Sequence, residues 1–138
     1  MISRRIFASC AICAVTGFAA TEVSAQGAPP AAATGITRKV LSQTDGPAPG
    51  YVTIIAEVEI APGVVAGRHT HPGIETGYVL EGSFDLPIAG RPTVTLKPGD
   101  AFQVPPETAH AGGPASPSKI RLISTFVVEK AKPLATPA

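Results

Sequence analysis

Cysteine is scarce in this chain of 138 residues, which carries only Cys10 and Cys13. Both lie in an N-terminal segment that we expect to be cleaved off, so the remaining chain would hold no cysteine at all. This absence excludes disulfide bonds, thiolate metal ligands and a catalytic thiol from the folded domain.

An excess of charge of one sign is also lacking. The chain has 11 basic and 10 acidic residues. The N-terminal segment holds two of the basic residues and one of the acidic ones, which leaves nine of each. The remaining basic residues are scattered, whereas binding to a phosphate backbone needs a clustered basic face. The composition therefore excludes a nucleic-acid-binding function.

The chain has one long apolar run, at residues 6–20, and no second one. This run is shorter than the ~20 residues that span a bilayer, so we expect no membrane span in the mature chain. Arg4 and Arg5 precede the run, and the small residues Val23, Ser24 and Ala25 follow it. This order is typical of an export signal. We interpret residues 1–25 as a cleavable signal peptide and expect a periplasmic or secreted protein.

Two export routes are compatible with this segment. The start SRRIF, residues 3–7, resembles the twin-arginine signal, whose pathway carries folded proteins. Ala8 and Ser9 depart from the usual Leu and Lys of that signal, so the ordinary secretory route stays open. A lipoprotein signal through Cys10 is disfavoured, because the apolar run before that residue is too short.

Proline and glycine, with 15 and 14 copies, interrupt the chain throughout. The runs between them are short and rich in Val, Ile, Thr and Phe, which is typical of β-strands. We predict strands near residues 36–41, 51–60, 64–71, 74–80, 83–88, 93–96, 101–104 and 120–129. Many short strands without crossover helices predict an all-β, antiparallel fold, either a double-sheet jelly roll or a small β-barrel.

Composition also sets the limits of the domain. Residues 26–35 are rich in Ala, Gly and Pro, and residues 130–138 have a similar character. We predict a flexible tether and a flexible tail for these two segments. No internal repeat is visible, so we expect a single barrel domain over residues 36–129.

Two of the three histidines, His69 and His71, are separated by a single residue. Side chains alternate along a strand, so both imidazoles point to one face, about 7 Å apart along the backbone. A Pro-Gly pair then bends the chain, which allows Glu75 to return to the same centre. Two nitrogens and a carboxylate oxygen suit iron, manganese, nickel or zinc. The third histidine, His110, follows the turn VPPETAH and is the natural fourth ligand.

These residues fall into two motifs that resemble those of the cupin superfamily. The first motif, G-x5-HxH-x3-E-x6-G, is matched in every slot by Gly63, His69, His71, Glu75 and Gly82. The second, G-x5-PxG-x2-H-x3-N, is matched at Gly99, Pro105 and His110. Glu107 replaces its second glycine, and Pro114 replaces its asparagine. The metal slots stay intact, but a non-glycine at position 107 must adopt a different turn or bear a small strain.

The resemblance covers roughly residues 36 to 128 and implies a jelly-roll barrel. It implies that one divalent transition metal is held by His69, His71, Glu75 and His110, with one or two coordination positions open to water or substrate. It also implies a homodimer that pairs through an outer sheet. The alternative is a metal-free barrel that keeps part of the pattern, since an HxH pair also occurs by chance on surface strands.

Three charged side chains have two interpretations each. Glu75 is interpreted as a ligand, but unliganded it would serve as the catalytic general acid or base, because burial raises a carboxyl pKa. Glu107, near the expected barrel mouth, is interpreted as solvated rather than substrate-binding. Arg121 is the one strand-borne cation that we consider for an anionic substrate, although its alternation with Ile120 and Leu122 favours a solvent-facing side chain.

Two classes of function follow from this site. The first is a metalloenzyme of the dioxygenase, decarboxylase or isomerase type, acting on a small oxygen-bearing organic molecule that chelates the metal. The second is a non-catalytic barrel that binds or senses a metal or a small molecule. Convergent polar groups in the pocket would favour the enzyme, and a purely apolar lining would favour the binder.

Overall fold

The computed structural model describes residues 34–113 and 115–138, and in these residues the chain forms strands and turns but no helix. The strands are β1 (Ile36–Asp45), β2 (Tyr51–Ile60), β3 (Ala66–Thr70), β4 (Gly73–Glu81), β5 (Phe84–Leu86), β6 (Val94–Leu96), β7 (Ala101–Val104), β8 (His110–Gly112), β9 (Ile120–Glu129) and β10 (Thr136–Pro137). Every strand pair is antiparallel. The all-β, antiparallel prediction is confirmed. The expected signal peptide, residues 1–25, lies outside the described residues.

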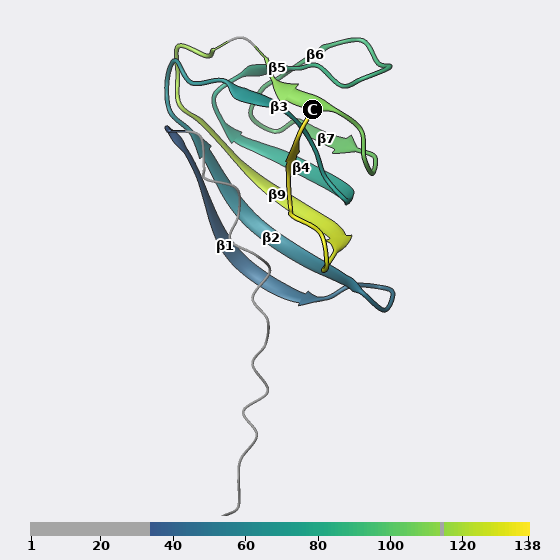
Figure 1. The fold of residues 1–138 in the computed structure, drawn as a ribbon. Helices are drawn as coiled ribbons and strands as arrows, with labels where there is room; N and C mark the ends of the chain where they lie inside the picture. Colours follow the sequence, from purple (N-terminus) through teal and green to yellow (C-terminus); the bar gives the residue numbers. More distant parts are fainter. Residues whose placement is uncertain (1–33, 114) are drawn as a thin grey trace, which may run out of the picture.

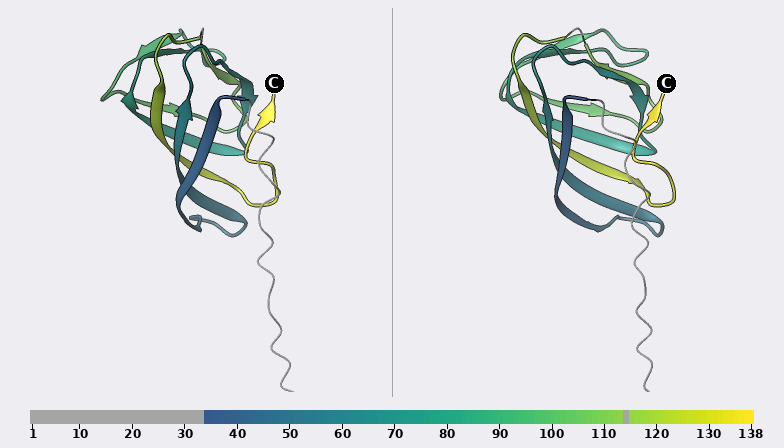
Figure 2. Two further views of the ribbon diagram at one scale, coloured as in Figure 1. Left: turned by 90° about the vertical axis from the view of Figure 1, so that its left-hand side faces the viewer. Right: turned by 60° about the vertical axis from the view of Figure 1, so that its left-hand side comes forward.

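The strands form a jelly roll of two layers (Figure 1). One layer is a five-stranded sheet in the order β1-β2-β9-β4-β7. The other consists of the three-stranded sheet β10-β3-β8 and the hairpin β5-β6. Figure 2 shows the long strands of the first layer curving toward the short strands of the second, which closes the layers into a barrel. Within the described residues, no helix is long and apolar enough to cross a membrane.

Strict alternation on β2 and β9 builds the core. The two strands pair along their full length, from Tyr51 opposite Glu129 to Ile60 opposite Ile120, and every second residue of each is buried. Their side chains divide between two clusters. The first core cluster is Ile36, Val58, Ile60, Val79, Phe84, Leu86, Leu96, Ile120 and Leu122. The second core cluster is Val52, Ile54, Ala56, Phe126 and Val128.

Ser124 breaks this pattern. It occupies an inward position of β9 between Leu122 of the first core cluster and Phe126 of the second, and it is fully buried. A buried hydroxyl needs a hydrogen-bond partner. The buried hydroxyl of Ser124 therefore marks a polar site at the junction between the two apolar clusters.

The predicted strand bounds at 51–60, 101–104 and 120–129 agree with the structure. Two strands were missed, β8 and β10, which have three and two residues. Both are too short to show an alternating pattern. β10 also contains a proline, a residue that is usually confined to sheet edges.

The expectation of a flexible tail at 130–138 is wrong for its last residues. Thr136 pairs with Thr70 and Pro137 with His69, and the Ala138 N–H donates to the Arg68 carbonyl at 3.1 Å. The half-buried Leu134 packs on the second core cluster. Composition alone indicated a free end, but an apolar side chain beside an open core face and an unpaired edge of β3 are enough to hold the segment.

Candidate metal centre

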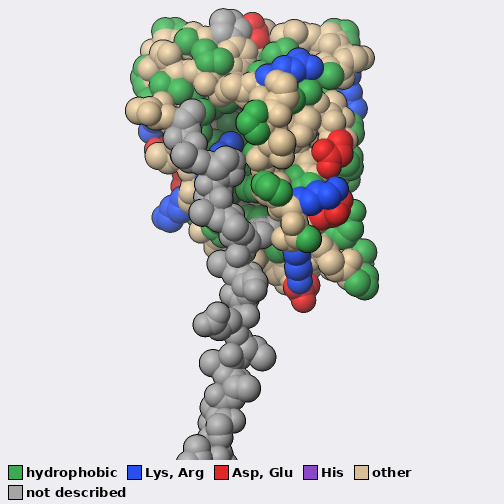
Figure 3. Space-filling view, in the orientation of Figure 1, with side chains coloured by type: hydrophobic (Ala, Val, Ile, Leu, Met, Phe, Trp, Pro, Cys, Tyr) green, Lys and Arg blue, Asp and Glu red, His purple; other side chains and the backbone are tan. Residues whose placement is uncertain are grey.

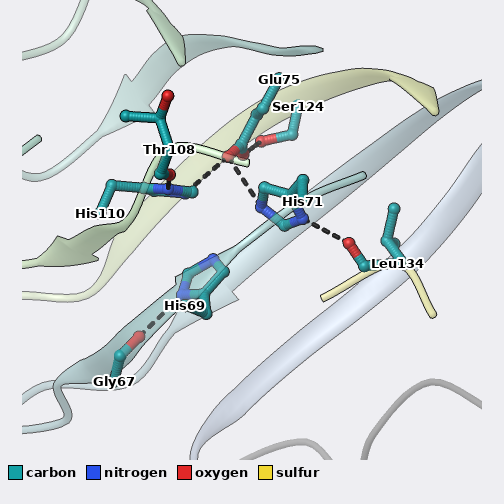
Figure 4. A network of polar contacts seen from close by, with 8 residues as sticks. All are labelled: Gly67, His69, His71, Glu75, Thr108, His110, Ser124 and Leu134. Atoms are coloured by element: carbon teal, nitrogen blue, oxygen red, sulfur yellow. Dashed lines mark hydrogen bonds and ion pairs between the residues drawn. The ribbon is translucent and has the colours of Figure 1, made fainter. Parts of the chain in front are cut away.

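The structure brings all four expected ligand residues together. His69 lies on β3, His71 directly follows it, Glu75 lies on β4, and His110 begins β8. One candidate ligand atom from each residue lies within 4.8 Å of those of the others. Figure 4 shows the three imidazoles and the carboxylate converging from separate strands. His71, Glu75 and His110 are buried, and His69 is partly exposed.

Glu75 is the centre of the hydrogen-bond network. Its Oε2 lies 3.0 Å from His110 Nε2 and 3.1 Å from His71 Nε2. Its Oε1 accepts a hydrogen bond from the Ser124 hydroxyl at 2.7 Å. Burial raises the pKa of Glu75, but the contacts with His110, His71 and Ser124 outweigh it and hold the pKa well below its usual range. The raised pKa that we expected from burial is therefore not found, and an ionised carboxylate suits a ligand better than a proton donor.

The Nδ1 atom of each histidine faces a backbone carbonyl. His69 Nδ1 is 2.7 Å from the Gly67 oxygen, His71 Nδ1 is 2.5 Å from the Leu134 oxygen, and His110 Nδ1 is 3.0 Å from the Thr108 oxygen. A carbonyl oxygen only accepts, so each Nδ1 must carry the proton. The neutral form of each ring then presents its Nε2 lone pair, which is the arrangement that metal-binding histidines adopt.

This arrangement tests whether a metal fits. The contacts that lower the pKa of Glu75 need a positive group beside the carboxylate, but with Nδ1 protonated a neutral His71 or His110 ring would turn only its Nε2 lone pair toward Glu75, where it would face another acceptor. A second proton on the rings or a cation among the four residues removes this repulsion. Burial, followed by the neighbouring charges of His110 and His71, lowers the pKa of His69 to about 4 despite its bond to Gly67. Neutral imidazole nitrogens with a carboxylate are the donor set of a divalent transition metal, so the residues fit the ion.

A cavity opens beside the four residues. With its open mouth it contains about 500 Å³ of space free of protein atoms. Its apolar lining comes from both core clusters and includes Phe84, Phe102, Leu122 and Phe126. Beyond the four candidate ligands, Arg38 and Ser124 are the polar side chains of the lining. Figure 3 shows hydrophobic side chains recessed in one face of the molecule, with charges of both signs mixed around them.

The turn before His110 contains the departure at Glu107. Glu107 has φ of 53° and is the one non-glycine residue with positive φ among the described residues. Its N–H donates to the His71 carbonyl at 2.9 Å, and its side chain is exposed. The residue therefore adopts the left-handed backbone that a glycine takes without strain, and bears the strain. Pro114, the other departure, lies outside the described residues.

Sequence reasoning missed three residues of this neighbourhood. Ser124 was signalled only by one polar residue at an inward position of β9. Leu134 contributes a backbone carbonyl, which no side-chain pattern reveals. Arg38 lines the cavity, whereas Arg121, the cation that we considered, faces outward and lies 3.6 Å from Glu57 and 3.8 Å from Glu81.

A two-layered β-barrel with three histidines and a glutamate converging inside it defines a class of protein, and the comparison with protein families agrees. The family model of the cupin domain matches residues 56–126, just over half of the chain and all four candidate ligands. The chain belongs to the cupin family.

Solved structures place the chain among barrels of the same kind. KdgF from Halomonas sp. is 27% identical, with a TM-score of 0.55 over 68% of this chain and 82% of that one. An RmlC-like cupin from Shewanella frigidimarina is 26% identical, with a TM-score of 0.58 over 69% and 78%. The polyketide cyclase RemF from Streptomyces resistomycificus, 24% identical with a TM-score of 0.62 over 80% and 75%, shares the fold. No curated protein matches the chain in sequence.

Proposed function

We propose that this cupin is an exported metalloprotein that binds one divalent transition metal, iron, manganese, nickel or zinc, and acts on a small oxygen-bearing molecule that chelates it. The observation that carries the proposal is the shared orientation of the rings: all three Nδ1 atoms face carbonyls, and the Nε2 atoms of His71 and His110 both lie within 3.1 Å of Glu75 Oε2, with which they would share the ion. When bound, the metal would polarise an oxygen of the substrate or lower the pKa of a water molecule.

The chain's own residues would prepare the reaction. His69, His71, Glu75 and His110 hold the ion, and the Ser124 hydroxyl fixes the free oxygen of the carboxylate. The apolar walls from both core clusters exclude water, which strengthens electrostatic interactions at the centre. The enzyme interpretation is supported by the cyclase activity named for one barrel of the same fold.

A non-catalytic binding barrel is the second candidate, and one observation favours it. Arg38 and Ser124 are the only polar side chains that the described cavity adds to the four candidate ligands, and Ser124 is already bonded to Glu75. Catalysis commonly needs further positioned acids, bases or donors. Turnover of chelating hydroxy or keto compounds, lost on metal removal, decides for the enzyme; stoichiometric binding without turnover decides for the binder.

The metal is tested by elemental analysis of the full chain purified without added metal. We expect close to one ion per chain, and less than a tenth of that in His110→Ala. Glu107→Gln is the matched control, because it changes an exposed carboxylate in the same turn and should keep the ion. Full metal occupancy in His110→Ala would refute the site.

We also propose that the chain forms a homodimer through the outer face of the five-stranded sheet. Large apolar side chains are exposed there on the two strands that flank β9: Ile55 on β2, and Ile74, Tyr78 and Leu80 on β4. Exposed apolar patches of this kind mark interfaces. Light scattering should give twice the chain mass for the wild type and the chain mass for Tyr78→Lys; a monomeric wild type would contradict this.

Export is proposed from residues 1–25, and the twin-arginine resemblance has a consequence for the metal. A protein that folds before export takes its ion from the cytoplasm. Affinity alone favours copper and zinc over iron and manganese, so the concentrations of available metal in the cytoplasm would then decide which ion is bound. We expect export to stop in a strain that lacks the twin-arginine pathway. Cleaved product in that strain would assign the chain to the ordinary secretory route.

A further inference from the structure

Arg38 has an unusual position for an arginine. It lies on β1 opposite Val58, a residue of the first core cluster, and two positions after the buried Ile36. Strand alternation therefore turns its side chain to the inner face, where it is half-buried and lines the same cavity as His69, His71, Glu75 and His110.

No described residue forms an ion pair or a side-chain hydrogen bond with Arg38. Five other cations among the described residues have carboxylate partners, namely Lys97, Lys119, Arg121, Lys130 and Lys132. Arg38 is partly buried, and withdrawing even part of a guanidinium from water without a partner is unfavourable. The charge of Arg38 is thus available to an anion that enters the cavity.

We propose that Arg38 is the anion-binding residue of this cavity and that the cavity takes a small organic acid. The carboxylate of the acid pairs with the guanidinium, and another oxygen atom of the acid reaches the centre of the four candidate ligands. The carbon skeleton of the acid lies on the aromatic and aliphatic lining. This inference deepens the proposed function by naming the substrate class, and its contact at the four candidate ligands rests on that function.

The small number of donors in the lining favours a carboxylate over a phosphate. A divalent ion with Glu75 and Arg38 gives the cavity a net positive charge, which attracts either anion. The planar guanidinium fork matches the two oxygens of a carboxylate. A phosphate has about two negative charges and three acceptor oxygens at neutral pH, and the described lining offers it a single guanidinium and the Ser124 hydroxyl, which already donates to Glu75.

Calorimetric titration of the zinc-loaded full chain tests the proposal. The probes are acetate, hydroxyacetate and 2-hydroxybenzoate, each compared with its amide, which has nearly the same shape and no charge. We expect the wild type to prefer at least one acid over its amide. Arg38→Gln should weaken binding of that acid tenfold or more and change amide binding less than twofold, and Arg38→Lys should restore part of the loss.

Lys39→Gln is the matched control, because it removes a positive charge from the next residue of β1, whose side chain is exposed. It should leave acid binding unchanged. If the wild type prefers no acid, or if Arg38→Gln weakens acid and amide equally, the proposal is overturned.

Zinc affinity, measured by competition with a chelator, separates this result from the proposed function. We expect Arg38→Gln to bind zinc as the wild type does. If the wild type binds no zinc, the metal proposal fails. The role of Arg38 is then tested separately, by whether the metal-free chain prefers acids over their amides.

Discussion

The two chain segments that supply the candidate ligands are built differently. The first, residues 69–75, holds three of them on or beside the strands β3 and β4. The second, residues 105–110, holds one after a turn whose residue Glu107 has a left-handed backbone. This turn is fastened to the first segment, since Glu107 N–H donates to the His71 carbonyl and His110 Nε2 lies 3.0 Å from Glu75. These contacts with the first segment thus hold the second segment in position.

Glu75 joins the two segments, so its replacement should have the largest effect. Glu75→Gln keeps the shape but removes the charge that faces His71 and His110. We expect metal affinity, measured by chelator competition, to fall at least a hundredfold, because carboxylate ligands must be ionised to bind. Glu81→Gln, at the exposed end of the same strand, is the control and should change the affinity less than twofold. Equal affinities would show that the two segments do not share an ion.

The tail supports the first segment and offers the next test. Ending the chain at Lys132 removes the Leu134 carbonyl that accepts the His71 proton, and the loss of such an orienting partner typically weakens a metal site about 10–100-fold. Leu134→Ala removes packing on the second core cluster but keeps the carbonyl. It should lower the melting temperature while leaving metal affinity within about threefold. Equal loss of affinity in both variants would attribute the effect to packing.

Acid should destabilise the metal-free protein through His69 before it acts on Glu75. The pKa of His69 is about 4 in the folded chain and 6.5 ordinarily, so the unfolded chain takes up the proton first as pH falls. Stability from the neutral ring is present above pH 6.5 and is lost toward pH 4, by about 1–2 kcal/mol after allowance for partial exposure. Glu75, with its lowered pKa, adds a loss below its ordinary value of 4.5. Urea midpoints measured from pH 7 to 4.5 should fall, and less steeply in His69→Gln.

The strained turn of the second segment should give the smallest effect. Glu107→Gly relieves the left-handed backbone, which costs an ordinary residue about 1–2 kcal/mol, but it adds flexibility to the unfolded chain. The net gain in the free energy of unfolding should be about 0.5–1 kcal/mol. Glu107→Ala also loses the exposed contact with Lys132 and keeps the strain, so it should gain nothing. A similar gain in both variants would exclude strain as its source.

The difference between the segments also explains what the sequence predicted. His69, His71 and Glu75 were found because alternation and a short bend are local rules, and His110 because it is the one histidine left and fits a motif slot. Arg38, Ser124 and Leu134 all lie 31 or more positions from the nearest ligand of the first segment. Leu134, in addition, contacts His71 only through its backbone carbonyl. Their neighbours are decided by the register of β1, β2, β9 and β10, which no local pattern contains. The missing glycine at position 107 predicted either a different turn or a small strain, and the positive φ of Glu107 shows that the residue bears the strain.

The pairing of β10 with β3 affects how the protein should be handled. Pro137 lies opposite His69, and Ala138 is bonded to Arg68. A polyhistidine purification tag fused after residue 138 would begin beside the strand that carries one of the three imidazoles and would bring many competing ones to it. The metal content measured for such a fusion would include ions bound to the tag as well as to the barrel. The tag should therefore be inserted elsewhere, for example in the exposed turn at residues 47–50.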